Sequence, residues 1–273
     1  MDWFKFLLNN TREELRETIA SIYSLVGASI PRPDFEKAVK DLTRSMKEKQ
    51  LEFQHGALLA LGYSFGRRNL LARMDKEELG DWSLYKETVG LIISQLDHSN
   101  SLIISAACLS LAELARCGPL PLTEEDKLSL LQRLLVLVKS SKTNIRLRER
   151  AALAAGSLCL GDCKFPHRRT LLESFIELAS DIKDIELHFS IGEALVFCSL
   201  GVRSPAARDG WSVEEDDFSP LDTDLQEEEG QQLDWLVSQL TGRLTRSTHP
   251  SVKQAACLWL LAVVKQCISQ SQV

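Results

Sequence analysis

The chain is poor in the residues that make turns and pleated sheets. Its 273 residues include only 14 glycines and 8 prolines, and aromatic residues make up 7%. An all-β protein needs many turns and is usually richer in aromatic and β-branched residues. Hydrophobic residues make up 44% and charged residues 26%, which is typical of globular chains and excludes a mainly disordered one. We therefore expect a folded, mainly helical protein.

The sequence also lacks an excess of positive charge, paired-cysteine motifs and a long apolar segment. A net charge of −6 argues against nucleic acid as the partner. The seven cysteines form no Cys-x-x-Cys motif and lie mostly in apolar runs, as buried thiols do in a reducing compartment. No signal peptide is recognisable, and the longest uncharged apolar stretch, 255–264, is about half of a membrane span. We expect a cytoplasmic or nuclear protein without a membrane span.

Apolar residues recur at the spacing of amphipathic α-helices. One run consists of Leu128, Leu131, Leu134, Leu135 and Val138, and residues 171–179 follow much the same pattern. Prolines and glycines interrupt the helical spacing at 31–33, 118–121 and 165–166, and no segment has the alternation of a convincing strand.

The predicted helices occur in pairs, and the second helix of each pair carries one recurring pattern. The pattern is polar-x-x-apolar-polar-x-x-small, followed by Ala or Leu four residues later, and residues 144–151 and 249–256 are clear copies. Aligning the copies gives anchor positions at Ala57, Ala107, Ala151, Ile191 and Ala256, which are 50, 44, 40 and 65 residues apart.

A period of about 40–47 residues with two helices per unit is typical of HEAT and armadillo repeats. A small anchor residue lets the inner helix approach its neighbour closely, and each unit buries its apolar faces only against adjacent units. We predict an all-α fold, a single α-solenoid segment over 1–273 with about five HEAT-like helical hairpin repeats. The alternative is an ordinary globular helical bundle.

The longest interval between anchors contains an acidic insertion, predicted at 201–231. Residues 209–230 include ten Asp and Glu residues and no Lys or Arg, and the rest of the chain would carry a net charge of +4. Such a segment repels itself and is expected to be flexible. Trp211 and Phe218 lie among the acids, so the segment is either a solvated linker or a docking segment for a basic partner.

A basic cluster at 139–150 is the clearest local charge feature of the remaining chain. It contains Lys142, Arg146 and Arg150, which share one helix face if the helix begins early enough, and Arg168 and Arg169 follow near the next turn. The cluster is either a solvated face, partly paired with Glu149, or a contact for an acidic partner or phosphate. The candidate partner-binding residues are therefore Lys142, Arg146, Arg150, Arg168, Arg169, Trp211 and Phe218.

Motifs for catalysis, cofactors and metals are missing or weak. Residues 62–66 match Gly-x-Ser-x-Gly around Ser64, but in a hydrolase that serine follows a strand, and residues 56–61 have helical spacing. Cys159, Cys163 and His167 have a spacing that zinc ligands can use, but Gly161 and Pro166 interrupt a helix there and no fourth ligand is evident. We expect no enzyme, no cofactor and no metal.

Four segments resemble the large HEAT-repeat proteasome adaptor and scaffold family. The resemblance is specific at 205–211 and 249–261, and it extends more generically to 53–62 and 147–152. It covers about 50 to 270. Since members of that family are several times longer, the resemblance implies that this chain is a fragment or a short isoform.

The resemblance implies a non-enzymatic adaptor that binds subunits of the 26S proteasome and links its core and regulatory particles. It also implies a role in the ubiquitin–proteasome pathway, including ER-associated degradation. Coupling of proteasomes to endoplasmic reticulum, endosomes, vesicles and motor proteins would follow from it, with peripheral membrane association. A different HEAT-repeat scaffold, similar to a nuclear transport receptor or a phosphatase scaffold subunit, is the alternative.

Overall fold

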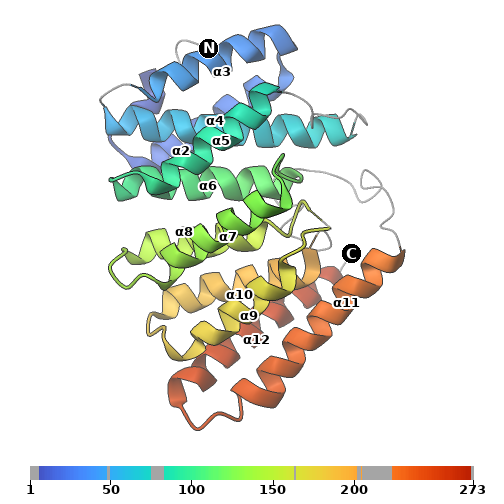
Figure 1. The fold of residues 1–273 in the computed structure, drawn as a ribbon. Helices are drawn as coiled ribbons and strands as arrows, with labels where there is room; N and C mark the ends of the chain where they lie inside the picture. The colour runs from blue at the N-terminus through green and yellow to red at the C-terminus, as the bar shows by residue number, and fades with distance from the viewer. Residues whose placement is uncertain are drawn as a thin grey trace. The chain divides into compact units, whose positions relative to one another are not determined.

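The computed structural model describes residues 6–47, 50–74, 83–162, 164–201, 204 and 223–271. Within these ranges every regular element is a helix and no strand is present (Figure 1). The predicted all-α repeat fold is confirmed. The contacts divide the chain into two compact units, 1–123 and 124–273, which are described separately. The single solenoid segment over 1–273 stays a prediction.

The first unit consists of a layer of inner helices with further helices against it. The inner helices α2, α4 and α6 pack side by side, α2 on α4 and α4 on α6, while α3 and α5 pack against these. The helices are α2 (Glu13–Ser29), α3 (Arg32–Ser45), α4 (Leu51–Met74), α5 (Ser83–Ser94), the short 3-10 helix η1 (Gln95–Asp97) and α6 (Ser101–Cys117).

The second unit repeats this arrangement. Inner helices α8, α10 and α12 pack in sequence, with α7, α9 and α11 as their outer partners. The helices are α7 (Glu124–Lys139), α8 (Ile145–Ser157), α9 (Arg168–Glu177), the 3-10 helix η2 (Leu178–Ser180), α10 (Ile185–Leu200), α11 (Thr223–Ser238), the π-helical η6 (Gln239–Leu244) and α12 (Pro250–Ser271).

Every predicted anchor residue lies on an inner helix and is completely buried: Ala57, Ala107, Ala151, Ile191 and Ala256. Glycines five residues after two of the anchors allow close contact between inner helices. A Cβ on Gly62 would lie 2.7 Å from the Cα of Ser110 on α6, and a Cβ on Gly156 would lie 2.7 Å from the Cα of Ala194 on α10. These contacts explain why the pattern requires small residues on the inner helices.

Inner helices within a unit run parallel. Along α4, Gly62 contacts Ser110 and Gly66 then contacts Glu113 and Cys117, so both helices advance in the same direction. An asparagine side chain immediately before the helix fixes where α6 and α8 begin. The Asn100 carboxamide oxygen accepts a hydrogen bond from the Leu102 amide at 2.9 Å, and that of Asn144 accepts from the Leu147 amide at 2.8 Å. Both are N-caps, which satisfy amides left unpaired in the first turn.

The structure differs from the predicted insertion at its C-terminal end. Helix α11 begins at Thr223, inside the range 201–231 that the acidic composition marks as a flexible insertion. Leu236 of α11 and Leu240 of the adjoining η6 are fully buried and anchor this helical segment. Extending an existing helix gains one hydrogen bond for each residue that is fixed and requires no new nucleation. The helix therefore continues back into the acidic segment. Residues 205–222 lie outside the described residues.

Candidate functional site

The predicted basic candidates separate into exposed and buried residues. Lys142 and Arg146 are exposed, together with Lys139 at the end of α7. Arg150 and Arg168 are buried, with 7% and 4% of their surface accessible. An incoming partner therefore meets only the first group.

Lys142, Arg146 and Arg150 do not share a helix face, because α8 begins after Lys142 and the early helix start that this arrangement requires is not met. Asn144 caps α8, so its first residue is Ile145 and Lys142 lies in the preceding turn. Glu149 lies close enough to Arg146 and Arg150 to feel their charge. Burial and the negative charge of Glu186 raise the pKa of the Glu149 carboxyl, while the two arginines oppose this increase.

Arg148 connects successive repeats of the second unit. Its Nε donates to the carbonyl oxygen of Val138 in the last turn of α7 at 2.8 Å, and its guanidinium lies 3.2 Å from the Asp184 carboxylate, which precedes α10. Since carbonyls of a last helical turn lack amide partners, a buried guanidinium is well placed there. The contacts make Arg148 a structural brace between α7 and α10.

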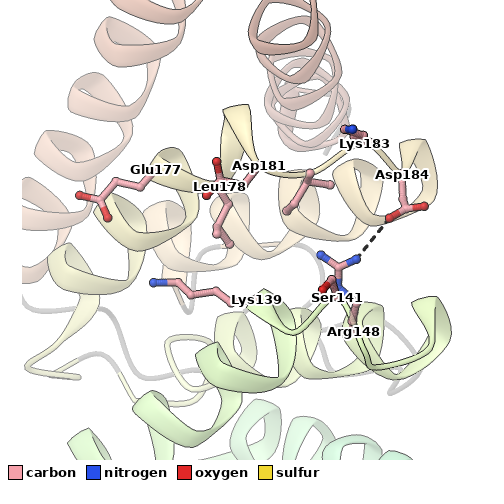
Figure 2. Close-up of a pocket in the computed structure, with 9 residues that line it drawn as sticks. Lys139, Ser141, Arg148, Glu177, Leu178, Asp181, Lys183 and Asp184 are labelled. Carbon is pink, nitrogen blue, oxygen red and sulfur yellow. Dashed lines mark hydrogen bonds and ion pairs between the residues drawn. The ribbon is translucent and has the colours of Figure 1, made fainter.

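A polar pocket of about 500 Å³ surrounds this brace. Figure 2 shows Lys139 and Glu177 toward one end and the ion pair of Arg148 with Asp184 toward the other. Three cations and three anions line it, with one hydroxyl and no histidine: Lys139, Ser141, Arg148, Glu177, Leu178, Asp181, Ile182, Lys183 and Asp184. The lining is therefore polar and carries charges of both signs.

Arg169 holds α9 against α11. Its guanidinium lies 3.7 Å from the centre of the Trp235 ring, and it contacts the Gln232 side-chain oxygen at 3.2 Å and the Glu173 carboxylate at 3.4 Å. A cation over an indole face is a stabilising arrangement. Arg169 is thus engaged within its own unit. The other two candidates, Trp211 and Phe218, lie outside the described residues.

The Gly-x-Ser-x-Gly match is a helical segment and not a nucleophile turn. Ser64 lies inside α4 and is 1% exposed, next to Gly27 of α2. A nucleophile needs an exposed oxygen and an adjacent base. The structure therefore supports the interpretation of this match as a coincidence.

Nothing among the described residues assembles zinc ligands around Cys159. Cys159 is buried, while His167 faces the backbone oxygen of Glu124 at 3.4 Å. Cys163 lies outside the described residues.

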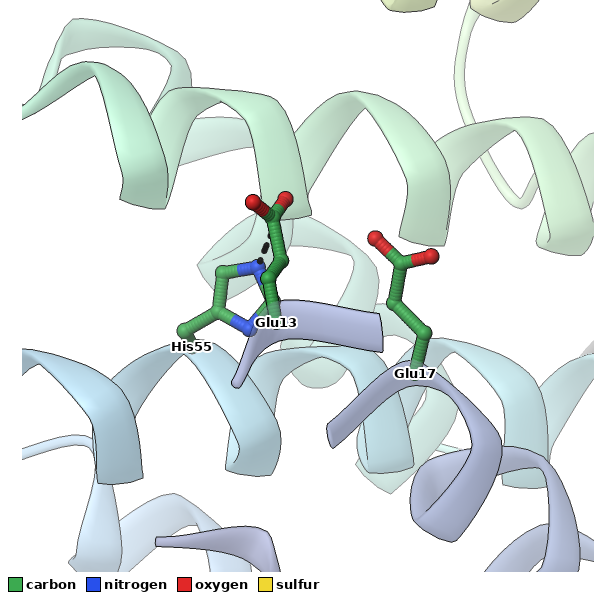
Figure 3. Close-up of side chains that lie close together, drawn as sticks. All are labelled: Glu13, Glu17 and His55. Carbon is green, nitrogen blue, oxygen red and sulfur yellow. Dashed lines mark ion pairs between the residues drawn. The ribbon is translucent and has the colours of Figure 1, made fainter. Parts of the chain in front are cut away.

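The first unit contains a charged cluster that no sequence motif indicates. Glu13, Glu17 and His55 bring three potential ligand atoms within 4.8 Å of one another (Figure 3). However, Arg16 donates from Nε to the Nδ1 of the buried His55 at 3.1 Å, and the Glu13 carboxylate lies 3.7 Å from its Nε2. An imidazole that accepts at Nδ1 carries its proton on Nε2, and a neighbouring guanidinium repels a cation. The cluster is a network of a buried guanidinium, a neutral imidazole and carboxylates, with a positive charge where a metal ion would sit.

Burial of Arg16 depends on this network. Its guanidinium also donates to the backbone oxygens of Asn10 and Thr11 at 2.6 and 3.1 Å. Burial lowers the pKa of Arg16, while the negative charge of Glu13 opposes the decrease. No sequence motif marks the network, because Arg16 and His55 are 39 residues apart.

Similarity to known proteins covers the whole chain. Residues 1–114 match the family model "ECM29, ARM-like repeats". The human "Proteasome adapter and scaffold protein ECM29" is 34% identical over 100% of this chain and 15% of its own length. The Drosophila melanogaster "Proteasome-associated protein ECM29 homolog" is 25% identical over 97% of this chain and 15% of its own. The chain thus spans about 15% of the length of these relatives.

Solved structures give a weaker likeness. A designed armadillo repeat protein in complex with the peptide (KR)4 is 13% identical, with a TM-score of 0.47 over 95% of this chain and 98% of that chain. This likeness is too low to assign a role to any residue here. None of the helices in the described ranges has the length and apolarity that crossing a bilayer requires.

The resemblance predicted from the sequence is confirmed: this chain is similar along its whole length to the human ECM29 proteasome adapter and scaffold protein and to its Drosophila homolog, and residues 1–114 match the family model of ECM29 ARM-like repeats.

Proposed function

We propose that the chain is a non-enzymatic scaffold that binds the 26S proteasome. The observation that carries the proposal is the 34% identity over the full chain to the human protein named as a proteasome adapter and scaffold. The chain spans only 15% of that relative, so the proposal concerns binding by this segment itself.

The physical character of the molecule supports binding rather than catalysis. Repeats of paired helices present extended surfaces to which a protein partner can bind. The polar pocket beside α8 contains charged groups without a nucleophile and base in contact. Recognition by shape and charge is the function that such a surface suits.

The contact we propose is the turn edge of the second unit, defined as Lys139, Lys142, Arg146 and Lys183. All four side chains are exposed, and two of them also line the pocket. Long cationic side chains at an exposed edge attract acidic surfaces and raise the association rate. We therefore expect an acidic surface on the proteasome as the counterpart.

The proposal also includes a linking of the core and regulatory particles of the proteasome by the protein. Coupling to endoplasmic reticulum, endosomes, vesicles or motor proteins, and a location in cytoplasm and nucleus, are further parts. The sequence resemblance supports all of them, and each has its own readout in cells.

The binding test uses the purified 273-residue chain, immobilised through a tag, and purified proteasome particles. Separate injections of the 26S particle, the core particle and the regulatory particle measure the affinity for each. The proposal expects retention of the 26S particle, and retention of both parts would support the linking role. A folded chain that retains no particle would contradict the proposal.

The turn edge is tested by a double charge reversal, Lys142→Glu with Arg146→Glu. Losing two favourable charge contacts is expected to weaken binding by about tenfold, with a reduced salt dependence. The matched control is Lys37→Glu with Lys40→Glu, which makes the same charge change at two exposed positions of α3. Equal weakening by both variants would show a non-specific charge effect and refute the turn edge as the contact.

A further inference from the structure

We propose that Arg148 is a binding site for a carboxylate of an acidic protein segment, and that Asp184 leaves Arg148 when this carboxylate binds. The proposal rests on the proposed function for the chemistry of the partner, an acidic protein surface. It adds to the turn edge a binding residue that the edge itself does not contain. The pocket around Arg148 lies at this edge, because Lys139 and Lys183 belong to both.

The guanidinium of Arg148 is buried and only partly used. Just 9% of the surface of Arg148 is accessible, and its Nε bond to the Val138 carbonyl holds the side chain against α7. One further N–H group contacts Asp184. With these two bonds counted, three of its five N–H donors have no partner among the described residues. Arg148 also lines the pocket of about 500 Å³, which has room for an incoming side chain.

The ion pair between Arg148 and Asp184 is easily replaced. A single contact of 3.2 Å joins the two groups, whereas an arginine and a carboxylate can form two parallel hydrogen bonds. The Asp184 side chain is 49% exposed, so water competes for its oxygens. Ion pairs with an exposed member contribute little to stability. A partner carboxylate that binds Arg148 through two bonds is therefore the better ligand.

Asp184 has a second role available to it, as the cap of α10. It is the N-cap residue, with φ −80° and ψ 122°, but its side chain makes no capping hydrogen bond. Asn100 and Asn144 occupy the same position before α6 and α8, and both cap their helix. Aspartate is as good an N-cap as asparagine. An Asp184 that turns away from Arg148 can therefore accept from an amide in the first turn of α10, which offsets the loss of the ion pair.

The remaining charges favour an anion at the Arg148 end of the pocket. Once Asp184 has turned to its helix, the lining holds three cations and two anions. One of these anions, Glu177, lies toward the end away from Arg148 in Figure 2. The other, Asp181, already accepts from the Ser180 hydroxyl at 2.9 Å. Because the turn edge around the pocket is cationic as well, an acidic protein segment is the occupant that this surface attracts.

Asp184→Asn tests the exchange by an expected gain of affinity. Asparagine removes the competing carboxylate and still caps α10, so the Arg148 guanidinium becomes available. We expect the 273-residue chain with this substitution to bind hexaglutamate about fivefold more tightly than the unmodified chain, in an NMR titration at low ionic strength. The matched control Asp181→Asn makes the same charge change in the same pocket and is expected to gain less than about twofold. Equal gains for the two variants would show a general charge effect and overturn the proposal.

Arg148→Lys, added to Asp184→Asn, is expected to remove this gain. Lysine keeps the positive charge but cannot hold a carboxylate through two parallel bonds, so the affinity for hexaglutamate is expected to fall by at least about tenfold. Circular dichroism verifies the fold. If the double variant unfolds, the Arg148 Nε–H resonance of the unmodified chain replaces it. That resonance and the Glu186 and Leu187 amides are expected to shift with hexaglutamate and to stay unchanged with hexaglutamine.

Inorganic phosphate is titrated separately, because it shares the anionic chemistry of a carboxylate. Phosphate that binds as tightly as hexaglutamate would contradict a protein segment as the ligand. A hexaglutamate titration that leaves Arg148 and the first turn of α10 unchanged would also overturn the proposal. Retention of the 26S particle that is unaffected by Asp184→Asn would refute the exchange and leave the proposed function standing. The expected gain with hexaglutamate, without retention of the particle, would support the exchange and refute the proposed function alone.

Discussion

Two contacts between inner helices, α4 with α6 in the first unit and α10 with α12 in the second, are built by different means. Between α4 and α6 the contact is small against small: Gly62 lies on the backbone of Ser110, whose hydroxyl donates to the Leu58 carbonyl at 3.0 Å. Between α10 and α12 the contact is built around a large residue. Trp259 is fully buried and donates from its indole nitrogen to the His188 carbonyl at 3.0 Å.

A glycine lies at each of these two contacts, but the group that it faces differs. On α10 a Cβ at Gly192 would lie 3.1 Å from the indole ring of Trp259 and 3.2 Å from the Cβ of Ala262. The missing side chain there makes room for an aromatic ring rather than for a backbone. The repeat pattern therefore fixes where helices meet, while the residues at the contact decide how sensitive it is to substitution.

The largest expected effect comes from removing the large residue, with Trp259→Ala. Deleting a buried aromatic side chain leaves a cavity and is expected to lower the free energy of unfolding by about 4 kcal/mol. Urea denaturation measures the loss, and hydrogen exchange locates it in α10 and α12. Trp259→Phe retains most of the volume and is expected to cost much less. Equal losses for the two variants would contradict a packing role for the ring.

The converse change adds one carbon to the small contact, with Gly62→Ala. A Cβ there would overlap the Ser110 Cβ and lie 2.7 Å from its Cα, so the helices must separate, at an expected cost of about 2 kcal/mol. The control Gly90→Ala is at an exposed position in α5 with open space and is expected to stabilise by about 0.5 kcal/mol. If both substitutions stabilise the protein, the close approach of α4 and α6 is wrong.

A smaller effect is expected from Ser110→Ala, which removes the buried hydroxyl donor and keeps the small volume. Loss of this hydrogen bond is expected to cost about 1 kcal/mol in thermal or urea unfolding. Ser29→Ala is the matched control, because its hydroxyl makes the same kind of bond, to Leu25 within α2, at an exposed position. We expect the control to change stability by less than half as much.

The smallest expected effect is a pH dependence of stability at the α10–α12 contact. Burial lowers the pKa of His188, whose Nε2 faces the Ile182 carbonyl at 3.1 Å and whose ring packs on Trp259. The unfolded chain therefore binds a proton at higher pH than the folded chain. The contribution of His188 to stability is complete above a pH of about 6.5 and is lost as the pH falls toward the lowered folded value.

His188→Gln tests this dependence, because glutamine does not titrate. Between about pH 7 and 5 the unfolding free energy of the variant is expected to fall less steeply than that of the unmodified chain. Identical slopes would show that His188 makes no linked contribution. The backbone carbonyl that accepts from Trp259 is unchanged by the substitution, so the helix contact itself is preserved.

Much of the fold could be predicted, because the repeat pattern records packing along a helix. Anchor residues such as Ala151 are small and regularly spaced. The polar residue seven positions before Ala151, Asn144, caps the helix that carries it. The exposure of the candidate side chains was harder to predict, since exposure depends on where a helix begins and what packs beside it. Arg150 is buried and Arg169 lies on Trp235, which is 66 residues away in sequence.

We propose that this chain binds proteasomes through the exposed turn edge and not through an interior site. Hydrogen exchange of the 273-residue chain with and without purified 26S proteasome tests it most directly. We predict protection at 139–146 and 181–184, with unchanged exchange in the buried inner helices. Binding-induced protection confined to other segments, or no protection while the particle is in excess, would contradict the account.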